Sequence, residues 1–341
     1  MPTGPLMIDI VGTSLSSEEI KILQSPSIGG VILFSRNYQS FSQIVELVKE
    51  IKAIKSPSLI VATDHEGGRV QRFKDPFTLI PSMNILGKIY QNDRKKSIKI
   101  ARKIGWLIAA EIRSIGIDLA FSPVVDLDLG LSTIIGDRSI HSNHKVVSEI
   151  ATELVSGMKS AGMSSTAKHF PTHAGAKNDS HKETAIDERS FHELANDIYP
   201  YSFLINSGIE SIMVGHVIFP KIDNVPASLS YKWIKKLRNE LKFKGAIITD
   251  DLSMAGARLN RDNPSSLVQK AIDVGCDMVI FCNAKNKINK IIEDLSGYVS
   301  FDSQPRLDKI RGKKDFIFKK LKESRIYKNN KREVLNLDSS Y

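Results

Sequence analysis

The sequence predicts a single (β/α)₈ barrel of the TIM-barrel class, an α/β fold with long loops on its catalytic face. Eight short apolar runs alternate with helical patterns along 341 residues, a length that suits one such barrel with extended loops. The runs are almost continuously apolar, as expected for parallel strands covered on both faces. No G-x-G-x-x-G motif follows the first run, which disfavours the alternative of an open, doubly wound sheet.

Each predicted strand is a short run that ends at polar or turn-forming residues. In chain order the predicted strands are Leu6–Val11, Gly30–Phe34, Leu59–Thr63, Leu119–Val125, Ser165–Phe170, Ser211–Val217, Ala246–Thr249 and Met278–Cys282.

Helical periodicity fills several of the intervals between these strands. Apolar residues from Ile44 to Ile54 and from Ile98 to Ile112 recur at the three- and four-residue spacing of an amphipathic helix. The series continues with Leu194–Ile205, Trp233–Leu241 and Leu267–Val274. Repeated alternation of strand and helix predicts a closed parallel barrel.

The last 41 residues differ from the rest in charge. We expect residues 1–300 to form the catalytic barrel and residues 301–341 to form a basic C-terminal helix or tail that packs on it or extends from it. This stretch has 12 Lys and Arg against 6 Asp and Glu, out of a net charge of +10. A solvated lysine-rich helix explains the excess more simply than binding to nucleic acid or lipid. We therefore expect no nucleic-acid or membrane partner, and a monomer or weak dimer.

The predicted location is the cytoplasm. The stretch from Met1 to Val11 has no basic n-region and no small-residue cleavage site. No apolar run approaches the ~20 residues that cross a bilayer. The two cysteines, Cys276 and Cys282, lie within or beside one predicted strand, so we expect buried thiols and no disulfide.

Two connections are unusually long: residues 65–94 after the third strand and residues 171–189 after the fifth. They are rich in His, Arg, Asp and Gly, and long loops in compact domains are usually functional or disordered. In a barrel, the loops that follow strands lie on the catalytic face.

Polar residues gather at the predicted carboxyl ends of six strands. They are Asp64, Asp126, Lys168 with His169, His216, Asp250 with Asp251, and Asn283. Any one of them could simply meet water, but in a barrel all six positions converge on one pocket.

Three kinds of chemistry fit such a pocket. Glycoside hydrolysis needs a carboxylate and a proton donor, metal-assisted hydrolysis needs several His and Asp ligands, and sugar binding without catalysis needs only hydrogen-bonding groups. Candidate metal ligands are His169, His173, Asp179, His181 and His216, but no H-x-H or H-E-x-x-H spacing is present.

Four motifs carry a family resemblance. Residues 62–73 read ATDHEGGRVQRF, 135–140 read IGDRSI, 168–173 read KHFPTH with DSHKE at 179–183, and 247–254 read IITDDLSM. In this order and spacing they resemble the bacterial family 3 glycoside hydrolases, and within them the single-barrel β-N-acetylglucosaminidases (β-hexosaminidases) of peptidoglycan recycling. The resemblance runs from about Gly4 to about Asn283, which leaves the basic tail outside it.

The resemblance implies a retaining enzyme that needs no metal and no other cofactor. Its substrates would be N-acetylglucosamine-containing muropeptides, such as N-acetylglucosaminyl-β-1,4-anhydro-N-acetylmuramic acid with or without peptide. Asp250 would be the nucleophile and would form a covalent glycosyl-enzyme. His181 would be the acid/base, and Asp179 would orient it. Residues implied in sugar binding are Asp64, Arg72, Arg138, Lys168 and His169.

The sequence departs from the family pattern at His65, where Gln is usual, and at Thr172, where Gly is usual. Two-carboxylate chemistry alone would have selected Glu66 or Glu183 as the acid in place of His181. A histidine acid/base does not repel phosphate, so a β-N-acetylglucosaminide phosphorylase is an alternative. Two further alternatives are a metal-dependent barrel hydrolase and a non-catalytic sugar-binding protein.

Overall fold

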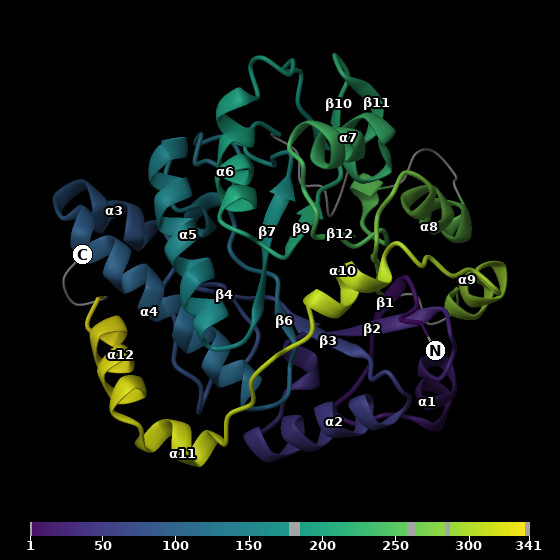
Figure 1. Cartoon of the computed structure of the whole chain (residues 1–341), viewed down its shortest axis with the longest axis horizontal. Helices are drawn as coiled ribbons and strands as arrows, with labels where there is room; N and C mark the ends of the chain where they lie inside the picture. The colour runs from purple at the N-terminus through teal and green to yellow at the C-terminus, as the bar shows by residue number, and fades with distance from the viewer. Residues whose placement is uncertain (1, 177–184, 258–262, 284–286, 338–341) are drawn as a thin grey trace.

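The structure is a computed structural model, and it describes residues 2–176, 185–257, 263–283 and 287–337 (Figure 1). Its main feature is an eight-stranded parallel sheet with the order β12-β9-β7-β6-β3-β2-β1-β13. The strands are β1 (Leu6–Asp9), β2 (Ile28–Leu33), β3 (Ile60–Thr63), β6 (Leu119–Ala120), β7 (Ser164–Phe170), β9 (Ser211–Val214), β12 (Ala246–Thr249) and β13 (Val279–Phe281).

The first and last strands of this order meet and close the sheet. The Asp277 amide donates to the Ile247 carbonyl at 2.8 Å, and the Thr249 amide donates to the Met278 carbonyl at 3.1 Å. Ile248 and Met278 form a parallel bridge. These contacts confirm the predicted barrel.

Short strands outside the barrel form two small sheets on its loops. The pair β4 (His65–Gly67) and β5 (Val70–Gln71) follows β3, while β8 (Ala185–Ile186), β10 (Val217–Phe219) and β11 (Asp223–Pro226) form a three-stranded sheet. The sixth predicted strand was therefore too long, because β9 ends at Val214 and Val217 begins a different strand.

Helices surround the barrel and cover its outer face (Figure 1). The α-helices in the described residues are α1 (Ser17–Leu23), α2 (Phe41–Ala53), α3 (Asn84–Asn92), α4 (Arg94–Arg113), α5 (His144–Ser160), α6 (Ala195–Asn206), α7 (Tyr231–Lys235), α8 (Pro264–Asp273), α9 (Ile288–Asp294), α10 (Gln304–Lys309), α11 (Phe318–Glu323) and α12 (Arg325–Leu335). None of the helices in the described residues is long and apolar enough to cross a membrane.

Local signals fix where several helices begin. Ser16 and Glu19 form a reciprocal capping box at α1, and Asp93 accepts from the Lys96 amide at the start of α4. Asn263 caps α8, whose first residue is Pro264. Each cap satisfies amides that have no partner inside the helix.

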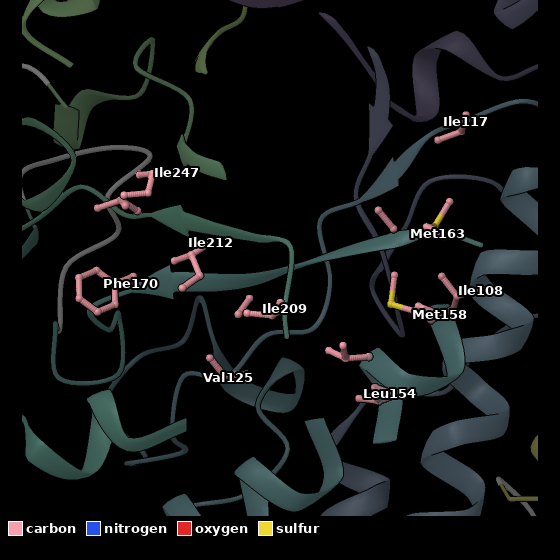
Figure 2. Packing of buried hydrophobic residues seen from close by; sticks show 14 of the residues in the cluster. Ile108, Ile117, Val125, Leu154, Met158, Met163, Phe170, Ile209, Ile212 and Ile247 are labelled. Carbon is pink, nitrogen blue, oxygen red and sulfur yellow. The ribbon is translucent and has the colours of Figure 1, made fainter. Parts of the chain in front are cut away.

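The core has two parts, because successive strand side chains point to opposite faces. Met7 belongs to the cluster inside the barrel, whereas Leu6 and Ile8 belong to the cluster between strands and helices. Figure 2 shows this outer cluster, where Ile212 and Phe170 on neighbouring strands belong to the same apolar layer as side chains from the helices. Both cysteines are buried, with Cys282 inside the barrel.

Leu307 of α10 and Ile310, the residue that follows this helix, belong to the interior cluster. The Gln304 side chain of α10 exchanges two hydrogen bonds with the backbone of Thr3. Because the strands begin at this side of the barrel, α10 closes the end opposite the loops that follow the strands.

Candidate active site

A cavity of about 380 Å³ lies at the carboxyl ends of the barrel strands. This is the face where barrel enzymes place their active sites. Its lining consists of Ile32, Phe34, Arg36, Asp64, Glu66, Arg69, Val70, Arg72, Phe121, Ile134, Arg138, Lys168, His169, His173, Met213, Asp250, Asp251, Met254, Ile280, Cys282 and Asn283. The side chains of Met213 and Ile280 belong to the barrel interior and form the apolar floor.

Asp250 and Asp251 directly follow β12 and lie in different surroundings. The Asp250 amide donates to the Val214 carbonyl at 2.9 Å, and Asp250 Oδ1 accepts from the Asp251 amide at 2.8 Å. Both carboxylate oxygens of Asp251 are tied to the protein by the Ser253 amide, the Ser253 hydroxyl and the Cys282 amide. The two neighbouring carboxylates are therefore not equivalent.

His216 follows β9 and lies beneath this pair. Its ring nitrogens contact the Ser228 hydroxyl at 2.8 Å and the Asp251 carbonyl at 3.0 Å. Burial lowers the pKa of His216 even though the nearby Asp250 acts in the opposite direction. A neutral ring with both nitrogens engaged is a structural support for the 250–251 turn.

Asp64 follows β3 and is held between two cations. Its Oδ1 accepts from Lys168 Nζ at 2.8 Å, and its Oδ2 accepts from Arg72 Nη2 at 2.8 Å. Burial alone would raise the pKa of Asp64, but Lys168 and Arg72 outweigh burial and hold that pKa well below its usual range. Asp64 is therefore an anion at neutral pH and can accept hydrogen bonds from hydroxyl groups.

Glu66 lies two residues farther, on the same side of the chain. It accepts two hydrogen bonds from the Arg138 guanidinium, at 2.8 and 2.9 Å, and its Oε1 lies 2.5 Å from Lys168 Nζ. Burial acts to raise the pKa of Glu66, but the two cations lower it. Lys168 thus bridges Asp64 and Glu66, which explains how a lysine is buried at the end of a barrel strand.

Asp126 organises the turn that follows β7. It accepts from the His169 amide at 3.1 Å, from His169 Nδ1 at 2.8 Å and from the His173 amide at 2.7 Å. The Nδ1 contact leaves Nε2 of His169 on the side of Arg138, whose Nη2 lies 3.5 Å away. His169 is therefore an oriented ring at the cavity wall.

His65 lies between Asp64 and Glu66 in the chain but points away from the cavity. Its ring is fully buried and contacts Phe73 and Phe77, with centroids 5.9 and 6.5 Å away. Neither ring nitrogen has a hydrogen-bond partner among the residues that the structure describes. Burial, assisted by the charge of Arg72, lowers the pKa of His65 to about 3, so the ring is neutral.

The structure brings together six of the eight predicted site residues. Asp64, Arg72, Arg138, Lys168, His169 and Asp250 all line the cavity. The other two, Asp179 and His181, lie outside the described residues, and their roles remain a prediction. Among the described residues, no three His, Cys, Asp or Glu side chains are grouped as a metal site would require.

Other lining residues were not selected from the sequence. They include Phe34 and Arg36, and the Arg36 guanidinium lies 4.7 Å from the Phe34 ring centroid. Their position at and just after the carboxyl end of the second predicted strand is the signal that could have identified them. Arg69 is also new; it pairs with Asp137 at 3.2 Å across two loops, a contact that strand ends do not reveal.

The comparisons with known proteins agree with the family resemblance of the sequence motifs. The family model described as the glycosyl hydrolase family 3 N-terminal domain matches residues 6–306. A β-hexosaminidase of Methylobacillus flagellatus is 44% identical over 314 residues, 92% of this chain and 90% of the relative. One from Thioalkalivibrio sulfidiphilus is 40% identical over 341 residues, 100% of this chain and 98% of the relative.

Solved structures give the same result. NagZ from Neisseria gonorrhoeae, in complex with N-trifluoroacetyl-D-glucosamine, matches with a TM-score of 0.93 at 36% identity, covering 99% of this chain and 98% of that one. A family 3 β-N-acetylglucosaminidase from Paenibacillus matches with a TM-score of 0.80 at 26% identity, covering 97% of this chain and 61% of that one.

Proposed function

This chain belongs to glycosyl hydrolase family 3, and on that premise we propose that it is a retaining β-N-acetylglucosaminidase acting in the cytoplasm. It is a glycoside hydrolase. Its proposed reaction removes a non-reducing terminal β-linked N-acetylglucosamine from a small glycan. The proposed natural substrate is a peptidoglycan fragment, N-acetylglucosaminyl-β-1,4-anhydro-N-acetylmuramic acid with or without a peptide.

The observation that carries this proposal is the distribution of carboxylates in the cavity. Asp64 and Glu66 are held by Arg72, Lys168 and Arg138. Asp251 is held by three donors of the adjacent loops. These three are therefore committed to binding or structure. Asp250, on the T-D-D motif that follows β12, lines the same cavity, and this position supports it as the residue that attacks the anomeric carbon.

The proton donor has to come from another residue type or another segment. Because Asp64 and Glu66 have lowered pKa values, neither carries a proton near neutral pH, as a general acid must. His181 is the proposed acid/base. A histidine with an ordinary pKa of ~6.5 can give and take a proton at that pH, and Asp179, two residues earlier in the chain, would orient it.

The sugar-binding proposal rests on complementary donors and acceptors. Arg138 and Lys168 provide only donors, whereas Asp64 provides only acceptors. A pyranose ring with several hydroxyls and one amide needs both. Arg72, beside Asp64, and His169, oriented by Asp126, complete the proposed set.

The test is release of 4-nitrophenol from its N-acetyl-β-glucosaminide, with a chelator present, by wild type, Asp250→Ala and His181→Ala. We expect release by wild type, loss of activity by about 10³-fold or more in Asp250→Ala, and a large loss in His181→Ala. Folded wild type that releases nothing would contradict the proposal. Formation of a sugar phosphate in the presence of phosphate would identify a phosphorylase instead.

A further inference from the structure

We propose that Glu66 is a positioning residue that holds Arg138 and Lys168 in the orientations that receive the sugar. The inference rests on the proposed function, since it assigns the purpose of a carboxylate within the same site. Glu66 is not expected to touch the reacting atoms.

The contacts of Glu66 account for most of its hydrogen-bonding capacity. Its Oε1 lies 2.5 Å from Lys168 Nζ and 2.9 Å from Arg138 Nη2, and its Oε2 accepts from Arg138 Nε at 2.8 Å. The exposed fractions of the Glu66 and Lys168 side chains are 3% and 2%. A carboxylate has about four lone-pair directions, and three of these are occupied by protein donors.

The geometry of the Arg138 contact restrains a long side chain. Two parallel hydrogen bonds fix the plane of the guanidinium as well as its position. Arg138 comes from the loop after β6, not from a strand end, and only 10% of its side chain is exposed. Its Nη1 also donates to the Ile134 carbonyl at 3.2 Å, but Glu66 is the contact that fixes the plane of the guanidinium.

The chain geometry explains why a glutamate at this position can reach both cations. Residues 65–67 form β4, so side chains alternate, and Asp64 and Glu66 face the cavity while His65 faces the aromatic cluster. The strand ends in Gly67, with φ of 104°, where an added Cβ would lie 2.6 Å from the Pro81 carbonyl oxygen. This close turn holds β4 against the loop that follows it.

Charge balance predicts what happens when Glu66 loses its charge. In Glu66→Gln, Arg138 would remain buried with no carboxylate partner, and Lys168 would be paired with Asp64 alone. Because an unpaired buried charge is costly, we expect the Arg138 side chain to rotate away from residue 66. We expect Lys168 to shift toward Asp64, its remaining carboxylate partner. Both changes would remove hydrogen-bonding groups from the sugar site.

The experiment compares Glu66→Gln, Arg138→Lys and the double variant, with kcat and KM measured on the chromogenic substrate. We expect kcat/KM of Glu66→Gln to fall about 100-fold, because small misplacements of binding groups have effects of this size. Most of the loss should appear in KM. The loss in the double variant should be smaller than the product of the two single losses, because part of the effect of Glu66 passes through Arg138.

Glu111→Gln is the matched control. Glu111 is also a buried glutamate, but its partners are Thr78 and Tyr327, away from the cavity. It should lower stability and leave kcat/KM unchanged. The alkaline limb of the pH profile of kcat/KM, which reports the loss of the proton from the general acid, should be the same in wild type and Glu66→Gln, whereas loss of that limb would make Glu66 the acid/base and overturn the proposal.

Other outcomes also decide the question. Unchanged kcat/KM in folded Glu66→Gln, or losses that multiply in the double variant, would overturn the proposal. If Glu66→Gln does not fold, Glu66→Asp replaces it, because aspartate keeps the charge but is shorter by one methylene. An unchanged KM in Glu66→Asp would also overturn the proposal. Inactive wild type would instead signal failure of the proposed function itself.

Discussion

At the scale of single residues, the pKa values of the buried acidic side chains depend on the groups that face them. Asp64 and Glu66 face cations, which lower their pKa values against the effect of burial. Glu111 faces hydroxyl and amide donors, and there burial prevails and raises its pKa. Burial alone therefore does not identify a general acid, and the charge of the immediate partners decides its protonation state.

His65 provides a test of this residue-scale reasoning through pH. Its pKa is about 3 in the folded protein and about 6.5 in the unfolded chain. Between these values the unfolded state binds one more proton, so stability rises with pH and is lost as pH falls below about 6.5. From pH 7.5 to 5.5 this residue should cost the folded state about 1.4 kcal/mol.

The measurement is urea unfolding of wild type and His65→Gln at both pH values. The pH-dependent loss of unfolding free energy should be smaller in His65→Gln by that amount, because glutamine does not titrate. His173 and His216 also have lowered pKa values and are retained in both proteins. Equal losses in the two proteins would show that His65 is not buried as a neutral ring.

The positions of strand ends located Asp64, Lys168, His169 and Asp250 without any relative. Asp64 and Asp250 directly follow β3 and β12, and Lys168 and His169 lie among the last residues of β7. It did not link Glu66 with Arg138, since these residues are 72 positions apart and Arg138 lies in a loop. Only the motif resemblance selected Arg138. The purpose of Asp126 was likewise hidden, because it depends on backbone amides of the turn at 169–173.

At the scale of elements, the sequence predicted all eight barrel strands but not all of the helices. It did not single out α5, although α5 packs closely on α4. The two helices can pack closely because glycines allow their backbones to approach. A Cβ added at Gly157 would lie 2.1 Å from the Arg102 carbonyl oxygen, and one at Gly105 would lie 2.0 Å from the Leu154 carbonyl oxygen.

This contact reverses the usual effect of a glycine in a helix. In an isolated helix, alanine is favoured over glycine by about 1 kcal/mol. In Gly157→Ala we instead expect stability to fall by about 1–3 kcal/mol, because the methyl group would push two backbones apart. Thermal melting checks this. Gly12→Ala is the control, since its Cβ would meet only the Ser14 carbonyl oxygen, at 3.9 Å.

At the scale of the whole molecule, the basic C-terminal segment packs against the barrel helices. Phe318 stacks on Phe41 with centroids 4.4 Å apart, and the Tyr327 hydroxyl donates to the buried Glu111 at 2.7 Å. Its lysines include exposed residues of α11, while Phe318, Leu321 and Val334 are buried. Charge counting could not reveal this packing, because it depends on apolar positions. A domain boundary at residue 300 remains a prediction.

Tyr327→Phe tests whether the hydrogen bond from Tyr327 to Glu111 stabilises the fold. Removing the hydroxyl takes one donor from Glu111, which should lower the unfolding free energy by about 1–3 kcal/mol. Tyr231→Phe, at a residue that is 61% exposed, should have no measurable effect in the same denaturant titration. Equal stability of the two variants would mean that α12 contributes little to the fold.

The central claim is that Asp250 forms a covalent bond with the sugar, and mass spectrometry tests it most directly. The enzyme is incubated with a slow fluorinated N-acetylglucosaminyl substrate, digested and sequenced by fragmentation. We expect one added sugar on the peptide spanning residues 247–254, attached at Asp250 and absent from Asp250→Ala. A sugar attached to Asp251, to Asp64 or to Glu66, or turnover with no adduct under conditions that trap a retaining enzyme, would contradict this account.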